Sequence, residues 1–328
     1  MSITVAGSRY GRRVQFRTFA IAMPTTFRGV NRREGMVVRG EVGWAEFSPF
    51  LDYSAVECVP WYQAALDSAN RPWPDRVRDR VPVNITVPAV DPDHAARIVL
   101  GSTCRTAKVK VAERGQCLAD DIARVEAVRD ALPLGGSLRI DANGGWEVGE
   151  AVKAIRKLDK AARGLEYVEQ PCATAKELAE VRRKVEVPIA ADESIRRSGD
   201  PFRVRDLEAA DVAVLKVQPL GGIHACYRIA EQIDMPVVVS SAVETSIGLA
   251  AGIALAAALP ELPFACGLAT TSLLDGDVVT EPLHPIDGCL PVIRPELDER
   301  AFARVAAPEE IEERWQLRLE AVREELEE

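Results

Sequence analysis

Two lysines close together in the chain are the residues best suited to chemistry. Residues 106–111 read Thr-Ala-Lys-Val-Lys-Val, and side chains of a β-strand alternate between its two faces, so Lys108 and Lys110 point the same way. Two adjacent ammonium groups lower each other's pKa and need anionic neighbours. Such a pair can supply a neutral amine near neutral pH, so we interpret this stretch as the source of an acid–base group.

Carboxylates end three of the short apolar runs that follow, and another lysine ends the next run. The positions are Asp141, Glu169, Asp192 and Lys216, at intervals of about 23 to 31 residues, each close to one strand–helix unit. Three converging carboxylates repel one another unless a cation lies between them, and oxygen ligands without a nearby thiolate or imidazole suit Mg²⁺. The order lysine, acid, acid, acid, lysine therefore predicts a magnesium site flanked by lysines.

The elements that must position these residues form a repeating pattern after Pro82. Short β-branched or apolar runs alternate with helix-length segments at about 23 residues per unit, which predicts a parallel sheet closed into a barrel with its active site at the C-terminal ends of the strands. The helix expected after Thr270 is missing, so we predict an α/β fold with a modified (β/α)8-type barrel, (β/α)7β. The predicted strands are 83–87, 107–111, 138–142, 166–169, 189–192, 212–217, 237–240 and 265–268.

The first part of the chain predicts a smaller unit of a different kind. From residue 3 to about residue 47, apolar and polar residues alternate in runs broken by Gly11, Pro24 and Gly35, which is typical of an antiparallel meander. A helix is predicted over 55–69, and the Pro/Arg-rich stretch 71–82 is interpreted as a linker.

The last part of the chain predicts an acidic helix over 308–328. Ile311, Trp315 and Leu319 lie on one face of it, so we expect it to pack on the N-terminal unit, with a solvated, disordered tail as the alternative. We therefore predict an α+β capping domain made of residues 1–82 and the C-terminal segment 290–328, and a barrel catalytic domain over 83–289.

Composition favours small-molecule chemistry inside the cell. The net charge of −9 and the lack of a basic patch with interleaved aromatic residues argue against a nucleic-acid partner. The apolar run 247–259 is too short to span a bilayer and predicts a buried helix, so we expect no membrane partner. Seven cysteines without a C-x-x-C pair favour reduced thiols packed as small core residues, and the N-terminus lacks the continuous apolar core expected of a signal peptide. We expect a cytoplasmic protein; the oligomeric state stays open.

Several motifs in this chain resemble those of the enolase superfamily, in its muconate-cycloisomerase-like branch. Gly-Trp-Ala-Glu at 43–46 is similar to the segment that closes the capping domain of that family, with Ala where Gly is common. Within the branch, the short chain, the loop 25–29 and the stretch 240–246 look most like the o-succinylbenzoate synthase family. The barrel motifs are Ala-Lys-Val-Lys at 107–110, Arg-Ile-Asp-Ala-Asn at 139–143, Tyr-Val-Glu-Gln-Pro at 167–171, Ala-Asp-Glu-Ser at 191–194 and Leu-Lys-Val-Gln-Pro at 215–219.

The resemblance implies a mechanism and a role for each residue. The chemistry removes a proton α to a carboxylate, with Mg²⁺, replaceable by Mn²⁺, held by the three acids. It implies Lys110 as the base and later the acid, and Lys216 as a fixed cation that stabilises the enediolate. The remaining candidates would hold the metal ligands in place or contact the substrate, with Arg28 closing over a succinyl carboxylate: Lys108, Arg28, Arg139, Asn143, Glu193, Ser240 and Gly267.

The resemblance favours the first of three functions and leaves the other two as alternatives. The first is a lyase of menaquinone synthesis that dehydrates 2-succinyl-6-hydroxy-2,4-cyclohexadiene-1-carboxylate. The second is an N-succinylamino-acid racemase or dipeptide epimerase that uses Lys110 and Lys216 as bases on opposite faces of a carboxylate substrate. The third is a metal-binding scaffold on a retained barrel. This function is disfavoured because a scaffold would not need lysines on both sides of the three carboxylates.

Overall fold

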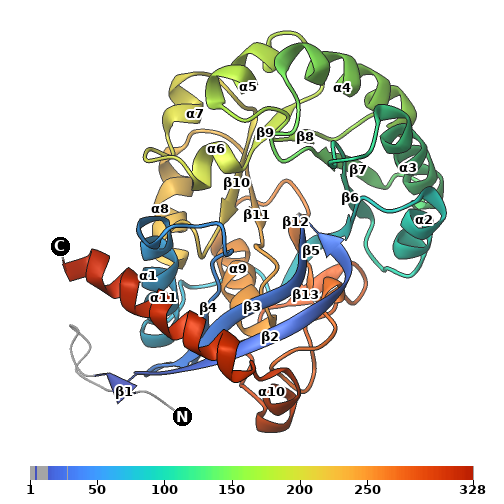
Figure 1. The fold of residues 1–328 in the computed structure, drawn as a ribbon. Helices are drawn as coiled ribbons and strands as arrows, with labels where there is room; N and C mark the ends of the chain where they lie inside the picture. Colours follow the sequence, from blue (N-terminus) through green and yellow to red (C-terminus); the bar gives the residue numbers. More distant parts are fainter. Residues whose placement is uncertain (1–3, 6–13, 28, 328) are drawn as a thin grey trace.

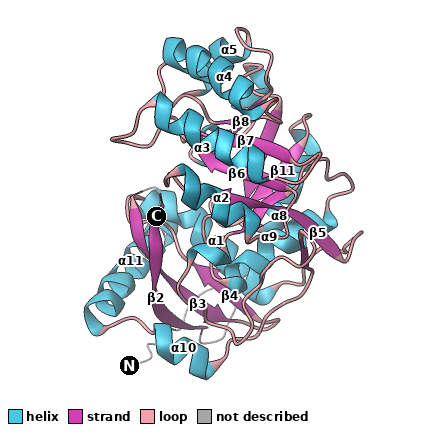
Figure 2. Cartoon of the chain, turned by 90° about the vertical axis from the view of Figure 1, so that its right-hand side faces the viewer, coloured by secondary structure: helices cyan, strands magenta, loops and turns pink. Residues whose placement is uncertain are grey.

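Two sheets organise the part of the chain that the computed structural model describes, which comprises residues 4–5, 14–27 and 29–327. The first is an antiparallel sheet in the order β1-β2-β3-β4, and the second is a parallel sheet closed into a barrel. Figures 1 and 2 show the antiparallel sheet at one end of the molecule and the barrel with its surrounding helices at the other. The predicted fold class is confirmed.

Eight parallel strands form the barrel, and they match the eight predicted runs. Each pairs with the strand next to it in sequence, and β12 pairs with β5, which closes the ring. A ninth strand, β13 (Cys289–Pro291), pairs antiparallel with β5. The barrel strands are β5 (Arg80–Val87), β6 (Thr106–Lys110), β7 (Ser137–Asp141), β8 (Val168–Glu169), β9 (Ile189–Ala191), β10 (Val212–Lys216), β11 (Val237–Ser240) and β12 (Cys266–Ala269).

Helices follow the first seven barrel strands and surround the ring (Figure 1). After β12 the chain makes only a 3₁₀ turn over Thr271–Leu273 before it runs on to β13, so the predicted (β/α)7β pattern is confirmed. The helices are α2 (Pro92–Leu100), α3 (Leu118–Ala131), α4 (Val148–Ala162), α5 (Ala175–Arg182), α6 (Glu193–Arg196), α7 (Arg203–Asp206), α8 (Ile223–Gln232) and α9 (Ser246–Ala258).

Helix α9 is buried along its whole length, as its Ala- and Gly-rich composition predicts. Small side chains let it approach the sheet closely: a Cβ added at Gly252 would lie 2.9 Å from the side chain of Leu268 on β12. Across the described residues, no helix has both the length and the apolar character needed to cross a membrane.

The cap joins the two ends of the chain. Its sheet comprises β1 (Thr4–Val5), β2 (Val14–Phe27), β3 (Val30–Arg39) and β4 (Trp44–Phe47), followed by α1 (Ala55–Asn70), which begins with a Ser54–Glu57 capping box. The chain returns through α10 (Glu299–Val305) and α11 (Glu309–Glu327). The apolar face of α11 packs into one core with β4 and α1, so the predicted packing is confirmed and the disordered tail is wrong. That face comprises Ile311, Trp315, Leu319 and Val322.

The meander differs from the prediction at two of its three expected breaks. Pro24 and Gly35 lie inside β2 and β3 rather than between strands; pairing between the two strands shifts register around Pro24. Gly35 pairs with Phe19, and a Cβ there would lie 2.4 Å from Cβ of Ser48, so glycine permits a close approach rather than a turn. Gly11 lies outside the described residues.

The predicted linker is shorter than expected, because residues 80–82 belong to barrel strand β5, and residues 71–79 are held against the barrel. Backbone N–H of Val77 donates to the carbonyl of Ala257 at 2.9 Å, and Arg78 donates to the carbonyls of Ala256 and Leu259 near the end of α9. The domain boundaries at 82 and 289 stay a prediction.

Five cysteines are buried as expected, whereas Cys117 is exposed just before α3, and Cys289 is partly exposed.

Candidate active site

Lysines and carboxylates meet at the C-terminal ends of adjacent barrel strands. Lys108 and Lys110 lie on β6, Asp141 and Glu169 end β7 and β8, Asp192 directly follows β9, and Lys216 ends β10. The register pairs Lys110 with Asp141 and Asp141 with Glu169. All six side chains are buried, with at most 6% of any residue exposed. The parallel strands thus bring together groups that lie far apart in sequence.

Each lysine is paired with a carboxylate. Nζ of Lys110 lies 2.5 Å from Oδ2 of Asp141. Nζ of Lys108 donates to both oxygens of Glu169 at 2.8 and 2.9 Å and lies 3.4 Å from Asp141. Nζ of Lys216 donates to Oδ2 of Asp192 at 2.6 Å. The ammonium groups therefore supply the counter-charge of all three acids.

These ion pairs, together with burial, shift the pKa values of Asp141, Glu169 and Lys108. Burial raises the pKa of Asp141, but Lys110 and Lys108 outweigh it and hold that pKa below its usual range. Burial and the charge of Asp141 raise the pKa of Glu169 to about 7. Burial lowers the pKa of Lys108, but Glu169 and Asp141 raise it above its ordinary value. The expectation that the lysine pair lowers its own pKa is therefore wrong for Lys108, because Glu169 and Asp141 lie within 3.4 Å of its ammonium.

The donor set fits a hard divalent cation. Asp141 and Asp192 both raise the pKa of Glu169, so the three carboxylates lie close enough to repel one another. Their donors are all oxygen, which suits Mg²⁺. Among the described residues, no three or more His, Cys, Asp or Glu side chains are arranged so that they could hold a metal ion as they lie. A cation would therefore compete with the lysines for the carboxylates that they now pair with.

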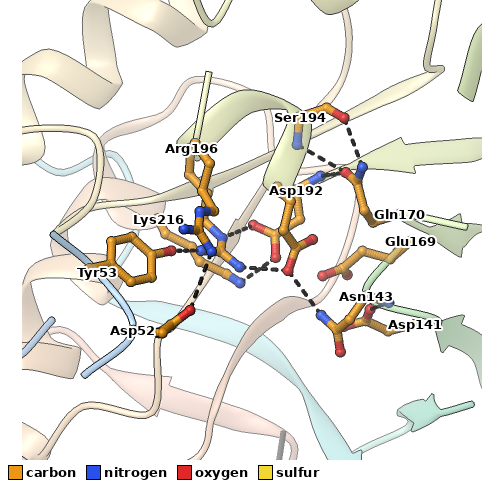
Figure 3. A network of polar contacts seen from close by, with 12 residues as sticks. Asp52, Tyr53, Asp141, Asn143, Glu169, Gln170, Asp192, Ser194, Arg196 and Lys216 are labelled. Carbon is orange, nitrogen blue, oxygen red and sulfur yellow. Dashed lines mark hydrogen bonds and ion pairs between the residues drawn. The ribbon is translucent and has the colours of Figure 1, made fainter. Parts of the chain in front are cut away.

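A second layer of polar residues orients the carboxylates (Figure 3). Nε of Arg196 donates to Oδ1 of Asp192 at 2.8 Å, and its NH2 donates to Glu193 at 2.6 Å. The side-chain oxygen of Gln170 accepts from the backbone N–H groups of Asp192 and Ser194 at 3.0 and 3.1 Å. Sequence reasoning missed Arg196 and Gln170. Arg196 follows Asp192 by four residues, one helical turn, and that spacing could have revealed it.

Of the three residues predicted to hold the metal ligands in place, Asn143 and Glu193 lie beside the three carboxylates and Arg139 does not. Backbone N–H of Asn143 donates to Oδ1 of Asp141 at 3.0 Å, and its side chain donates to Glu193 at 3.1 Å. Arg139 is buried lower in the barrel, where it donates to the Tyr167 hydroxyl and to the carbonyl of Ala265, just before β12. Arg139 therefore supports the layer of the barrel beneath the three carboxylates rather than the carboxylates themselves.

A small cavity of about 20 Å³ opens onto the lysines. Ser240 and Gly267 line it, as predicted from their strand-end positions; a Cβ at Gly267 would lie 2.5 Å from Oγ of Ser240, so glycine is needed there. Arg28 lies outside the described residues. Phe27 lines the cavity with its ring centroid 4.9 Å from Nζ of Lys110. Sequence reasoning missed further lining residues from the cap and the strand ends, which are Phe50, Thr86, Ser241, Ala242, Val243 and Thr270.

A buried polar junction joins the cap to the loop that lines this cavity. Glu46, at the end of the Gly-Trp-Ala-Glu motif, accepts from the backbone N–H of Thr245 at 3.0 Å and from Oγ of Ser48 at 2.5 Å. Arg33 donates to the carbonyl of Val243 at 3.0 Å. Burial and the nearby Glu244 raise the pKa of Glu46 to about 7. The cap thereby fixes the position of one wall of the cavity.

The fold and the site together are those of an enolase-like barrel. Family models described as "Enolase C-terminal domain-like" and "Enolase N-terminal domain-like" match residues 92–296 and 18–69. Muconate lactonizing enzyme from Pseudomonas fluorescens superposes with a TM-score of 0.75 at 22% identity, over 89% of this chain and 98% of that chain. A dipeptide epimerase from Enterococcus faecalis, solved with Mg and a dipeptide, superposes with a TM-score of 0.73 at 24% identity, over 90% and 98%.

Curated relatives of this chain are much closer in sequence. A protein of Thermobifida fusca named o-succinylbenzoate synthase is 63% identical over 307 residues, which is 94% of this chain and 95% of that relative. One of Mycolicibacterium smegmatis with the same name is 51% identical, over 90% of this chain and 91% of the relative. The chain belongs to the enolase superfamily and, within it, to the o-succinylbenzoate synthase family.

Proposed function

We propose that this protein is an o-succinylbenzoate synthase, a hydro-lyase of menaquinone biosynthesis. Its substrate would be 2-succinyl-6-hydroxy-2,4-cyclohexadiene-1-carboxylate and its products 2-succinylbenzoate and water. The observation that carries the proposal is the 63% identity to a synthase, over nearly all of both chains, together with Lys110 and Lys216 lining one buried cavity. The absence of disulfides among the described cysteines fits a cytoplasmic site for this reaction.

The two lysines would have different tasks. As a neutral amine, Lys110 takes the proton from ring carbon C1, α to the carboxylate, onto its Nζ, and the electron pair of that bond remains on the substrate as an enediolate. Lys110, now an ammonium, returns the proton to the hydroxyl that leaves C6, so water departs and the ring becomes aromatic. Lys216, held at 2.6 Å by Asp192, stays cationic and stabilises the negative charge. Asp141, Glu169 and Asp192 would hold Mg²⁺, which would supply positive charge to stabilise the enediolate.

A direct assay tests this function. Purified protein is mixed with the cyclohexadiene substrate, and formation of the aromatic product is followed by absorbance. We expect turnover with Mg²⁺, loss of turnover after exhaustive chelation, and recovery when Mg²⁺ is returned. Full turnover in the chelated protein would contradict the metal assignment.

A second substrate separates this function from racemisation. N-succinylamino acids are incubated with the same protein in deuterated water, and α-proton exchange is measured. A synthase should aromatise the cyclohexadiene with a far higher kcat/KM than it shows for exchange or racemisation. Comparable kcat/KM values for the two substrates would overturn the single-function proposal in favour of a promiscuous racemase.

A further inference from the structure

Tyr53 of the cap lies between two consecutive arginines of the barrel. It is in the segment that joins β4 to α1, and 7% of the residue is exposed. NH1 of Arg196 donates to its hydroxyl, and the guanidinium of Arg197 lies 4.5 Å from its ring centroid. Arg197 also donates to Glu57 of α1 at 2.7 Å. Figure 3 shows the Tyr53 hydroxyl directed at the Arg196 guanidinium, so cap and barrel meet at this side chain.

Arg196 links Tyr53 to Asp192 and Lys216 in the candidate site. Its Nε donates to Oδ1 of Asp192 at 2.8 Å, while Oδ2 of the same carboxylate accepts from Lys216 at 2.6 Å. The side chain of Arg196 is only 1% exposed, so water does not readily replace a lost partner. An unbroken series of hydrogen bonds thus runs from Tyr53 through Arg196 and Asp192 to Lys216.

The ring of Tyr53 also holds the cap segment that borders the cavity. Its centroid lies 5.5 Å from that of Trp61 in an edge contact and 6.3 Å from that of Phe50. Backbone N–H of Tyr53 donates to the carbonyl of Phe50 at 3.2 Å. Because Phe50 lines the cavity, the position of Tyr53 determines where this wall lies.

We propose that Tyr53 is a positioning residue, whose hydroxyl couples the seating of the cap to the orientation of the metal ligand Asp192. When the cap segment lies against the barrel, the Tyr53 hydroxyl accepts a hydrogen bond from Arg196. Arg196 then holds Asp192 in one rotamer. When the hydroxyl is removed, a buried N–H of Arg196 loses its acceptor and the guanidinium shifts toward other partners, which loosens Asp192. The inference rests on the proposed function, because it assigns Asp192 to the metal.

A pair of tyrosine variants tests this coupling. Tyr53→Phe removes the hydroxyl that accepts from Arg196, and Tyr62→Phe removes a matched one: Tyr62 is also 7% exposed and accepts from Nε of Arg323 at 3.2 Å, within the cap alone. Binding of Mg²⁺ without substrate is measured by titration calorimetry. Partners of metal ligands contribute about 10- to 100-fold to metal affinity, so we expect Tyr53→Phe to weaken Mg²⁺ binding by about tenfold and Tyr62→Phe to leave it unchanged.

A second readout does not depend on the metal. Hydrogen exchange of the backbone amides at 50–54 is measured in chelated protein, and we expect faster exchange in Tyr53→Phe than in wild type or Tyr62→Phe. A purely packing role for Tyr53 predicts unchanged exchange, because the ring and its contacts with Trp61 and Phe50 remain. Unchanged exchange together with unchanged Mg²⁺ affinity in Tyr53→Phe would overturn the proposal.

The route through Arg196 is tested by a double-mutant cycle. Arg196→Lys keeps the charge but cannot hold Asp192, Glu193 and Tyr53 at once, so Tyr53→Phe should have little further effect on Mg²⁺ affinity in that background. Additive losses would exclude Arg196 as the intermediary. If wild type binds no Mg²⁺ and dehydrates no substrate, the proposed function fails; if wild type does both and Tyr53→Phe matches it, only the present inference fails.

Discussion

Lys110 and Lys216 face one cavity but differ in their partners. Nζ of Lys110 pairs with Asp141 and lies beside Asn143, whereas Lys216 pairs with Asp192, a carboxylate already fixed by Arg196. Asp141 is held by the backbone N–H of Asn143, whereas Asp192 is held by a permanently charged side chain, and such a partner suits a lysine that remains charged throughout the reaction. At the scale of single residues, this difference favours one proton carrier and one stationary cation.

Arginine substitutions separate the two roles. Arginine keeps the positive charge but does not deprotonate at accessible pH, so Lys110→Arg should lower kcat by about 10³-fold or more, whereas Lys216→Arg should leave measurable turnover. The measurement is kcat at saturating substrate, with circular dichroism as the control for folding. Equal losses in the two variants would mean that both lysines carry protons, as in a racemase.

At the scale of elements, the junction between β4 and the loop after β11 makes stability depend on pH. Glu46 has a pKa of about 7 in the folded protein against an ordinary value of 4.5. Glu244 faces it and Arg33 lies beside it, while Ser48 and Thr245 donate hydrogen bonds. Between these two pH values the folded protein binds the proton more tightly than the unfolded chain does. The stabilising contribution is therefore fully present below the unfolded pKa and is lost as pH rises through the folded one.

Replacing Glu46 by Gln should remove this dependence. The difference between the two pKa values corresponds to about 3 kcal/mol, so the free energy of unfolding of Glu46→Gln should gain about that much relative to wild type between about pH 4.5 and pH 8. Urea denaturation of both proteins across this range gives the difference. All other titrating groups, Glu244 included, are present in both proteins. Parallel pH curves for the two would contradict the assigned pKa.

At the scale of the whole molecule, the C-terminal helix completes the core of the N-terminal unit. Trp315 is fully buried against Phe47, with ring centroids 5.9 Å apart, and Nε1 of its indole donates to Glu34 at 3.0 Å. The cap therefore needs both ends of the chain, and the cap in turn supplies Phe27 and Phe50 to the cavity. Stability of α11 is thus a condition for a complete site.

Two leucines on α11 measure how much its apolar face contributes. Leu319 is 5% exposed and Leu317 is 67% exposed on the same helix. Leu319→Ala should lower the free energy of unfolding by about 2–5 kcal/mol, because it leaves a cavity in the cap core, whereas Leu317→Ala should change it by about 0.5 kcal/mol or less. Urea denaturation followed by tryptophan fluorescence measures both. Similar losses would show that α11 does not depend on this face for its packing.

Local patterns in the sequence determined the barrel, the cap and the main residues of the site. Strand alternation placed Lys108 and Lys110 on one face, and the regular spacing of strand ends brought Asp141, Glu169 and Lys216 to one rim, because parallel strands of a closed barrel share their carboxyl edge. The same patterns predicted all eight barrel strands and the packing face of α11. They failed at Pro24 and Gly35, where a register shift and a close approach replaced the expected turns.

Only the tertiary structure decided which side chains form hydrogen bonds and ion pairs with the site residues. Tyr53 and Arg196 are 143 residues apart, and Glu46 and Thr245 are 199 apart, so no local period links them. The sign of the pKa change at Lys108 likewise depended on Glu169 lying within 3 Å of its ammonium, a closeness set by the packing of three strands. Periodicity reports which face a side chain takes, because backbone geometry is local; charge and hydrogen bonding depend on distances between segments, and those follow from how the segments pack.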